Sequence, residues 1–238
     1  MTIVLHHLGI SQSERIVWLL EELGLQYKLV KHVRDPVMAP GSLKSVPGNK
    51  PGKAPFIEDT DAGITLSESN AITDDIIYKY GNGKLALPPS HKNFADYLYW
   101  KDFANSTTQP NMMTSMFLTL GNVSKDEMIA QFAEGRLHAG FKHMDERLGQ
   151  SKWLAGKEFT AAETMSVYAL TTQRYFGPRV SLAGYDNILR WLKDCSERPA
   201  YQKAMEKGDP EMKLLLRADA PEVGMMESGG SQSSHWKK

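Results

Sequence analysis

The sequence predicts an α/β domain followed by an all-helical domain. Before Gly81, short segments rich in β-branched residues alternate with helical patterns, whereas strand signals vanish after Lys92. Between the two regions, Gly81-Asn82-Gly83 and Pro88-Pro89 interrupt any regular element. The predicted order is therefore a βαβ unit, a ββα unit and then helices only.

The first predicted unit is a strand, a helix and a second strand. The opening strand, Thr2 to His6, is followed after Gly9 by a change to helical periodicity. The apolar positions of that helix are Ile16, Leu19, Leu20 and Leu23. Gly24 ends it, and Tyr27 to Lys31 alternates like a strand. A strand, helix, strand unit is typical of a parallel sheet.

The second predicted unit follows a long Pro- and Gly-rich loop, Asp35 to Gly52, with room for one helical turn. Pro55 to Glu58 is a strand, and Asp59 to Gly63 is a hairpin turn into the strand Ile64 to Leu66. A helix from about Ser69 to Tyr80 completes the unit.

The region after Lys92 contains only helical patterns. The clearest are a helix opening at Phe94, a long one within Lys125 to Leu148, one after the capping box Thr160-Ala161-Ala162-Glu163, and one from Asn187 to Ser196 that ends near Pro199. The predicted boundaries are a first domain over 1–81, a linker over 82–91, a helical domain over 92–216 and a disordered Ser- and Gly-rich tail over 217–238.

Composition excludes several classes of function. Lys and Arg number 28, as do Asp and Glu, so no net charge attracts nucleic acid or an anionic membrane. No apolar run reaches the length of a membrane span, and the start lacks a signal-peptide pattern, so we expect a cytoplasmic protein. The single cysteine, Cys195, excludes an intrachain disulfide and a CxxC pair.

The histidines do not predict a metal site. His6 and His7 are adjacent on a strand and face opposite ways, and the five-residue spacing of His138 and His143 does not fit a helical ligand pair. We therefore expect no metal.

Four motifs together resemble the cytosolic glutathione transferase family, in particular its serine-type, fungal-like branch, over about residues 2 to 205. They are Ser11-Gln12-Ser13-Glu14-Arg15 before Trp18 to Leu25, Gly52-Lys53-Ala54-Pro55 before a strand, Leu66-Ser67-Glu68-Ser69-Asn70-Ala71-Ile72, and Trp153-Leu154-Ala155-Gly156 with the Thr160 capping box. Each motif alone is common, and their order and spacing carry the resemblance.

The resemblance implies a thioredoxin-like glutathione-binding domain followed by the helical domain, with glutathione as co-substrate and no other cofactor. It implies that Ser11 activates the glutathione thiol, with Ser13 as the other candidate. Pro55 would follow a cis bond, so that Ala54 pairs with the peptide backbone of glutathione. Lys53 would reach its glycine carboxylate, and Ser69 and Glu68 its γ-glutamyl carboxylate and ammonium.

Each of these residues also has an ordinary structural interpretation. Ser11 and Glu14 form a capping-box pattern, Ser67 or Ser69 suits a helix N-cap with Glu68 in the first turn, and Lys53 suits a solvated loop. An X-Pro bond such as that of Pro55 is trans in most proteins. For Arg15 the default role is structural. The presence of all four motifs together favours the glutathione-binding roles.

An apolar acceptor site is predicted in the helical domain, facing Ser11. Its lining would be Tyr99, Phe103, Met112 and Met116, although apolar residues at helical spacing are more often simple core. The expected reaction is conjugation of glutathione to a small apolar electrophile, as in detoxification. The alternatives are glutathione-dependent peroxide reduction and a non-catalytic glutathione-binding protein of the same fold.

The chain also departs from the family pattern. Asn105 stands where an acid is expected, Glu163 replaces the usual Asp of the capping box, and the loop before Gly52 is longer than usual. The resemblance further implies a homodimer.

Overall fold

A computed structural model describes residues 3–238. The chain forms two compact units. The first unit contains the chain up to Ala86 together with Ser196–Leu214 and Met225–Lys238, and the second contains Leu87–Cys195 and Leu215–Gly224. The first unit therefore consists of three segments that are far apart in the sequence.

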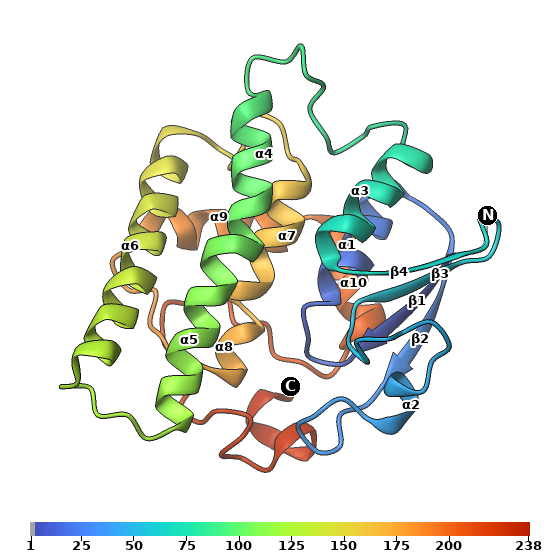
Figure 1. Ribbon diagram of the computed structural model, residues 1–238. Helices are drawn as coiled ribbons and strands as arrows, with labels where there is room; N and C mark the ends of the chain where they lie inside the picture. Colours follow the sequence, from blue (N-terminus) through green and yellow to red (C-terminus); the bar gives the residue numbers. More distant parts are fainter. Residues whose placement is uncertain (1–2) are drawn as a thin grey trace. The chain divides into compact units, whose positions relative to one another are not determined.

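A four-stranded mixed sheet forms the centre of the first unit, in the order β2-β1-β3-β4 (Figure 1). The strands are β1 (Ile3–Leu8), β2 (Tyr27–His32), β3 (Phe56–Asp59) and β4 (Ile64–Ser67). β1 pairs with β2 in parallel, with Ile3 opposite Tyr27, and β3 is antiparallel to both β1 and β4. This is the thioredoxin-like arrangement, and the predicted βαβ and ββα units are confirmed.

Helices α1 (Glu14–Leu23), α3 (Ser69–Lys79) and α10 (Pro199–Gly208) lie together on one side of this sheet (Figure 1). On the predicted apolar face of α1, Ile16, Leu19 and Leu20 are fully buried and Leu23 is partly buried. Gly24 ends the helix in the left-handed conformation with φ 67°. Helix α2 (Gly41–Lys44) covers the other face, since Leu43 packs on Leu8, whose side chain points away from that of His7.

Helix α10 is absent from the sequence prediction, which ends the preceding helix near Pro199 and assigns 92–216 to one helical domain. In the structure Pro199 begins a helix, because the first turn needs no N–H donor from proline. The ring of Tyr201 packs edge-on against Trp18 of α1 at 4.9 Å between centroids, and Arg198 forms an ion pair with Glu22 at 2.5 Å. Residues 196–214 therefore belong to the first unit.

The second unit is helical, as predicted. Its elements are α4 (Phe94–Phe103), a π-helical turn (Ala104–Thr108), α5 (Gln109–Leu120), α6 (Met128–Gln150), α7 (Ala161–Leu170), α8 (Gln173–Phe176) and α9 (Asp186–Ser196). Every residue of α7 is buried, which makes it the central helix of the unit. The predicted capping box is confirmed, with the Thr160 hydroxyl accepting from Ala162 and the Glu163 carboxylate accepting the Thr160 N–H at 2.9 Å.

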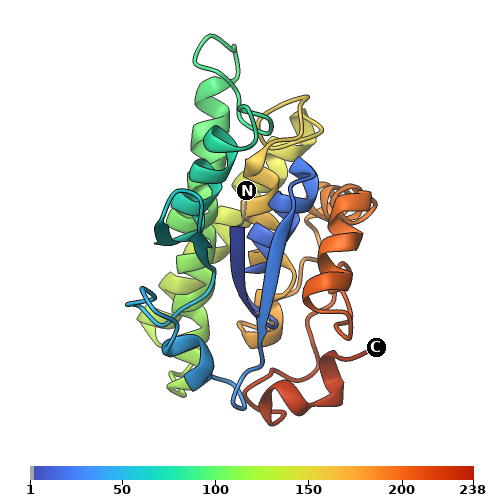
Figure 2. The same ribbon diagram turned by 90° about the vertical axis from the view of Figure 1, so that its right-hand side faces the viewer.

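The tail differs from the predicted disorder over 217–238. Gly230–Gln232 and Ser234–Trp236 form short 3₁₀ helices, and the Trp236 side chain is buried. The Ser231 N–H donates to the Pro36 carbonyl at 2.8 Å, so the red terminal segment lies beside the loop that follows β2 (Figure 2). Composition emphasises serine and glycine here, whereas Met225 and Trp236 supply the apolar surface that is buried.

Candidate functional site

Ser11 lies in the turn between β1 and α1. Its hydroxyl is 2.7 Å from the Leu8 carbonyl oxygen and 2.8 Å from the Ser13 hydroxyl, and it accepts the Ser13 N–H at 3.2 Å. The Ser11 hydroxyl therefore satisfies a backbone donor in the turn that leads into α1, in the manner of a cap. The same hydroxyl keeps a proton to donate, so a cap and a thiol activator are compatible roles for it.

Ser13 is less accessible than Ser11. It is fully buried, whereas 4% of Ser11 is exposed, and its hydroxyl accepts the Leu8 N–H at 3.1 Å and lies 2.8 Å from His7 Nδ1. Ser13 is also the residue that precedes the first turn of α1, although its side chain makes no cap bond. Of the two candidates, Ser11 has the more accessible side chain.

Asp209, which the sequence did not single out, holds the turn between β1 and α1. Ile10 has φ 54°, which is a strained conformation for a β-branched residue. Its N–H donates to Asp209 Oδ1 at 2.9 Å, and Asp209 Oδ2 accepts from His7 Nε2 at 3.1 Å. On the other side Arg34 donates to the carbonyls of Gly9 and Ile10, at 3.0 and 2.9 Å. No local motif marks Asp209, which is 199 residues from Ile10 in the sequence.

His6 and His7 face opposite ways, as predicted. His6 bonds Glu58 at 2.8 Å and His32 at 3.0 Å, while His7 bonds Ser13 and Asp209. Burial lowers the pKa of His32, and the electrostatic effect of the neighbouring His6 and His7 lowers it further. Among residues 3–238, no three His, Cys, Asp or Glu side chains gather as a metal-binding group.

The second motif lies next to the Ser11 turn. The Ala54–Pro55 bond is cis, as the resemblance implies, and both residues are buried. Gln12 Nε2 donates to the Ala54 carbonyl at 3.1 Å, and the Asn49 side chain donates to the Lys53 carbonyl at 3.1 Å. Lys53 itself is exposed. Gln12 and Asn49 are two positioning residues that the motif comparison did not single out.

The third motif begins α3. Glu68 precedes the helix with φ 71°, and Ser69, its first residue, is 3% exposed. Arg15 is buried, and its Nη1 lies 3.4 Å from both Ser69 Oγ and Gln12 Oε1. A guanidinium beside a helix N-terminus makes this position favourable for a carboxylate. Arg15 thus contacts candidate binding residues as well as filling the core.

The three motifs of the first unit meet at the N-terminus of α1. Gln12 links the Ser11 turn to Ala54, and Arg15 links it to Ser69. Residues that are up to 54 positions apart in the sequence therefore surround one helix end. The Ser11 hydroxyl, the Ala54 backbone and the positively polarised N-terminus of α3 lie around this helix end. These groups suit an extended peptide-like ligand with terminal carboxylates.

The predicted acceptor-site residues lie in the second unit. Phe103, Met112 and Met116 are 8%, 0% and 8% exposed, whereas Tyr99 is half exposed and its hydroxyl lies 3.0 Å from His143 Nε2. The rings of Tyr99 and Phe103 are in contact, with centroids 5.6 Å apart. The burial of the other three fits the core interpretation better than an open pocket.

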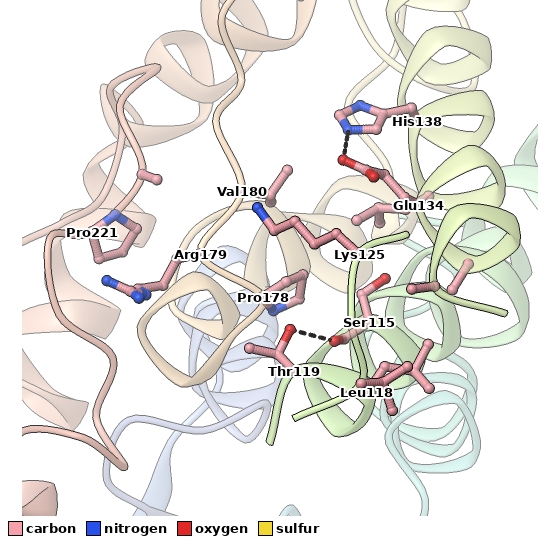
Figure 3. A pocket seen from close by; sticks show the side chains of 15 residues that line it. Ser115, Leu118, Thr119, Lys125, Glu134, His138, Pro178, Arg179, Val180 and Pro221 are labelled. Carbon is pink, nitrogen blue, oxygen red and sulfur yellow. Dashed lines mark hydrogen bonds and ion pairs between the residues drawn. The ribbon is translucent and has the colours of Figure 1, made fainter. Parts of the chain in front are cut away.

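A cavity of about 380 Å³ in the second unit was not anticipated from the sequence. Figure 3 shows Ser115, Leu118 and Thr119 from α5, Glu134 and His138 from α6, and Pro178, Arg179 and Val180 around it. None of the four predicted acceptor residues lines this cavity. Its mixed lining marks a second candidate surface for a ligand of that unit.

No helix within residues 3–238 combines the length and apolar character required to cross a bilayer.

Comparison with known proteins gives one consistent result. Residues 3–76 match the model of the glutathione S-transferase N-terminal domain, and residues 108–199 match that of the C-terminal domain. The chain is 32% identical over 221 residues to glutathione S-transferase 3 of Schizosaccharomyces pombe, covering 86% of this chain and 87% of the relative.

Solved structures agree. A glutathione S-transferase from Actinobacillus pleuropneumoniae is 31% identical with a TM-score of 0.76, over 87% of this chain and 93% of that one. A glutathione transferase homolog from Lodderomyces elongisporus, solved with two GSH per subunit, shares the fold at a TM-score of 0.69 and 19% identity, over 87% and 99% of the two chains.

Proposed function

The chain belongs to the glutathione S-transferase family, and from this premise we propose that it ionises the glutathione thiol and transfers the sulfur to a small apolar electrophile. The observation that carries the proposal is the meeting of Ser11, Ala54 and Ser69 around the N-terminus of α1. Glutathione is the co-substrate, and the mechanism requires no metal.

Ser11 stabilises the thiolate. A free thiol of this kind has a pKa of about 8.5, so near neutral pH it must lose a proton before it attacks. Donation of the Ser11 hydroxyl proton to the sulfur, together with the positive end of α1, favours the anion. A pKa lowered by about two units corresponds to about 2.7 kcal/mol, which one charge-assisted hydrogen bond and a helix dipole together supply.

The remaining motifs orient glutathione. The backbone N–H and C=O of Ala54 pair with the cysteinyl residue as an added antiparallel strand does, and the carbonyl has a second lone pair beyond the one used by Gln12. Ser69 and the N-terminus of α3 bind the γ-glutamyl carboxylate, with Arg15 close by. Glu68 accepts the ligand ammonium, and Lys53 binds the glycine carboxylate.

The test is ultraviolet titration of the thiolate of bound glutathione in wild type, Ser11→Ala, Ser13→Ala and Ser45→Ala. We expect Ser11→Ala to raise the thiol pKa by about one to two units, since one hydrogen bond to a charged sulfur is lost. Ser45 is exposed in the same unit and serves as the matched control. An unchanged thiol pKa in Ser11→Ala would refute the role of Ser11.

Conjugation, peroxide reduction and non-catalytic binding of glutathione differ in the molecule that reacts with the thiolate. Cys195 is buried, so chemistry through a protein cysteine is not the expected route. Conjugation assays with apolar electrophiles and a parallel hydroperoxide assay separate transfer from peroxide reduction. Retention on immobilised glutathione without either activity would favour a non-catalytic binding protein.

The second unit supplies the apolar acceptor surface in this proposal. Tyr99 is the most accessible of its four predicted residues, whereas Phe103, Met112 and Met116 are buried. We also propose a cytosolic homodimer, as is typical of the family, and sedimentation at micromolar concentration distinguishes it from a monomer.

A further inference from the structure

Four side chains of the first unit form a continuous hydrogen-bonded row that ends at Ser11. Asp209 Oδ2 is 3.1 Å from His7 Nε2, His7 Nδ1 is 2.8 Å from Ser13 Oγ, and Ser13 Oγ is 2.8 Å from Ser11 Oγ. The residues come from the end of α10, from β1 and from the start of α1. All four are more than nine-tenths buried.

We propose that this row is a proton relay, in which His7 supported by Asp209 accepts the proton that the glutathione thiol loses at Ser11. The proposal rests on the proposed function, because it explains where the thiol proton goes. It assigns His7, Ser13 and Asp209 to the reaction, whereas the motifs of the family resemblance include only Ser13 among them.

The direction of each hydrogen bond follows from Asp209. An ionised carboxylate only accepts, so His7 Nε2 carries a proton and, in neutral His7, Nδ1 is an acceptor. Ser13 then donates to Nδ1, which leaves its oxygen to accept the Leu8 N–H and the Ser11 hydroxyl. In the resting state the Ser11 proton therefore points toward Ser13 or the Leu8 carbonyl. The Ser11 oxygen accepts the Ser13 N–H with one lone pair and has a second lone pair to accept from an arriving thiol.

Proton transfer reverses the direction of the hydrogen bonds between the thiol, Ser11, Ser13 and His7. The S–H bond breaks as its proton binds Ser11 Oγ, the Ser11 proton moves to Ser13 Oγ, and the Ser13 proton moves to His7 Nδ1. The products are a thiolate and a doubly protonated His7, with no other bond made or broken. Ser11 now donates to the sulfur, Ser13 donates to Ser11, and His7 donates to Ser13 and Asp209. The thiolate-stabilising bond is thus a consequence of the transfer.

The charge balance favours this acceptor. Before transfer the buried group carries one negative charge, on Asp209, and after transfer it carries one, on the sulfur, because His7 and Asp209 neutralise each other. The thiolate gains from the N-terminus of α1, where the dipole favours an anion. The role resembles the carboxylate–histidine pair that orients and stabilises an imidazolium in serine hydrolases.

The side chains around His7 do not provide a competing proton site. His32 on β2 has a lowered pKa, and Lys237 forms an ion pair with Glu211 at 3.1 Å. The charged or titratable residues lining the pocket shared with His7 are Lys31, His32, Arg34, Asp209, Glu211 and Lys237. Asp209 is the carboxylate within hydrogen-bond distance of the imidazole among the described residues.

Two glycines allow the close approach of Asp209 and His7. A Cβ on Gly9 would lie 3.2 Å from Asp209 Oδ1, and one on Gly208 would lie 3.2 Å from His7 Nε2. Larger residues at either position would displace the carboxylate or the ring. The packing is therefore as tight around this pair as the relay requires.

Asp209→Asn is the sharpest test. The amide oxygen still accepts the Ile10 N–H, but the amide N–H₂ now donates to His7 Nε2, so the ring proton moves to Nδ1 and His7 no longer accepts from Ser13. We expect the pKa of the bound thiol to rise by about one unit or more, which is about fivefold less thiolate near pH 6.5, where the wild-type thiol is about half ionised. Ser13→Ala interrupts the row at its centre and should give the same shift. A purely structural role for Asp209 predicts no shift in Asp209→Asn.

The number of protons released when glutathione binds to the wild-type protein tests the relay without any variant. Calorimetric titration with reduced glutathione near pH 7.5, in two buffers of different ionisation enthalpy, measures the protons released on binding. Thiolate absorbance measured in parallel gives the amount ionised. We expect clearly fewer than one proton released per thiolate formed, because His7 keeps it. Release of one full proton per thiolate would overturn the relay.

The outcomes separate the two proposals. If Ser11→Ala raises the thiol pKa while Asp209→Asn and Ser13→Ala do not, the relay is wrong and the proposed function stands. If Ser11→Ala has no effect on the thiol pKa, the proposed role of Ser11 is wrong and the relay is wrong with it, whereas the conjugation assay still tests the transfer itself. Thermal unfolding of each variant confirms that it is folded, with Ser45→Ala as the matched control.

Discussion

Gln12 illustrates how one side chain connects two motifs. It stands one position after Ser11, and its amide donates to the Ala54 carbonyl at 3.1 Å. This bond fixes the edge on which glutathione is proposed to pair, without touching the sulfur. In the proposed function, the peptide portion of glutathione and its thiol would therefore depend on different side chains of the same turn.

Gln12→Ala should weaken glutathione binding without changing the thiol pKa. One neutral hydrogen bond contributes about 1 kcal/mol, so we expect the Kd to rise by about fivefold. Titration calorimetry measures the Kd, and thiolate absorbance measures the pKa in the same samples. A shift of the thiol pKa as large as that in Ser11→Ala would contradict the separation. Gln26→Ala, at an exposed site outside the turn, is the control.

Local sequence patterns identify candidate residues that lie in a turn or at the start of a helix. Ser11, Pro55 and Ser69 each lie within a recognisable turn or helix start. Asp209 was not identified, because its significance arises from contacts with His7 and Ile10 across the unit. For Arg15 the sequence predicts only a structural role, since nothing in α1 alone indicates its proximity to Ser69. Tertiary contacts between distant segments leave no periodic signal.

Among the secondary-structure elements, helix boundaries are predicted well where the sequence contains a strong start or stop signal. Gly24 ends α1, and Thr160 and Glu163 begin α7 as a capping box. Pro199 was interpreted as the end of a helix, whereas it also starts α10, so the same residue has two meanings that only packing against Trp18 decides. The apolar residues Met112 and Met116 fit a helix, but periodicity does not distinguish a helix that lines a pocket from one that fills the core.

The capping box of α7 gives a pH-dependent prediction for an element. Burial raises the pKa of Glu163 from 4.5 to about 7, against the opposing effect of hydrogen bonds from Thr160 and Leu154. A folded pKa above the unfolded value means that the contribution of Glu163 to stability is complete below about pH 4.5 and is lost as the pH rises through about 7.

Glu163→Gln should therefore remove a pH trend. The amide places N–H₂ against N–H donors, so the variant should be less stable than wild type throughout. The stability advantage of wild type should shrink by up to about 2 kcal/mol between about pH 5.5 and 8, as the buried carboxyl ionises. Urea unfolding across this range measures the difference. A constant difference would show that the carboxylate is ionised throughout, held by its three donors.

At the scale of the whole molecule, the C-terminal segment belongs to the first unit. Residues 225–238 return to the first unit after the helical unit is complete. Trp236 is 7% exposed and donates to the Gly230 carbonyl at 3.3 Å, while Ser231 and Trp236 line the same pocket as His7 and Asp209. The tail thus closes one side of the proposed relay.

Truncation after Gly224 should affect both stability and proton retention. Loss of the buried Trp236 and Met225 side chains removes apolar contacts worth several kcal/mol, since large-to-small changes at buried aromatic residues cost about 3 to 5 kcal/mol. We expect a lower Tm, and more protons released per thiolate because water then reaches the His7–Asp209 pair. Trp236→Ala, with the chain otherwise intact, should lower the Tm to a smaller extent. An unchanged Tm after truncation would mean that the tail does not pack on the unit, and an unchanged proton count with a lower Tm would mean that packing of the tail and access to the relay are independent.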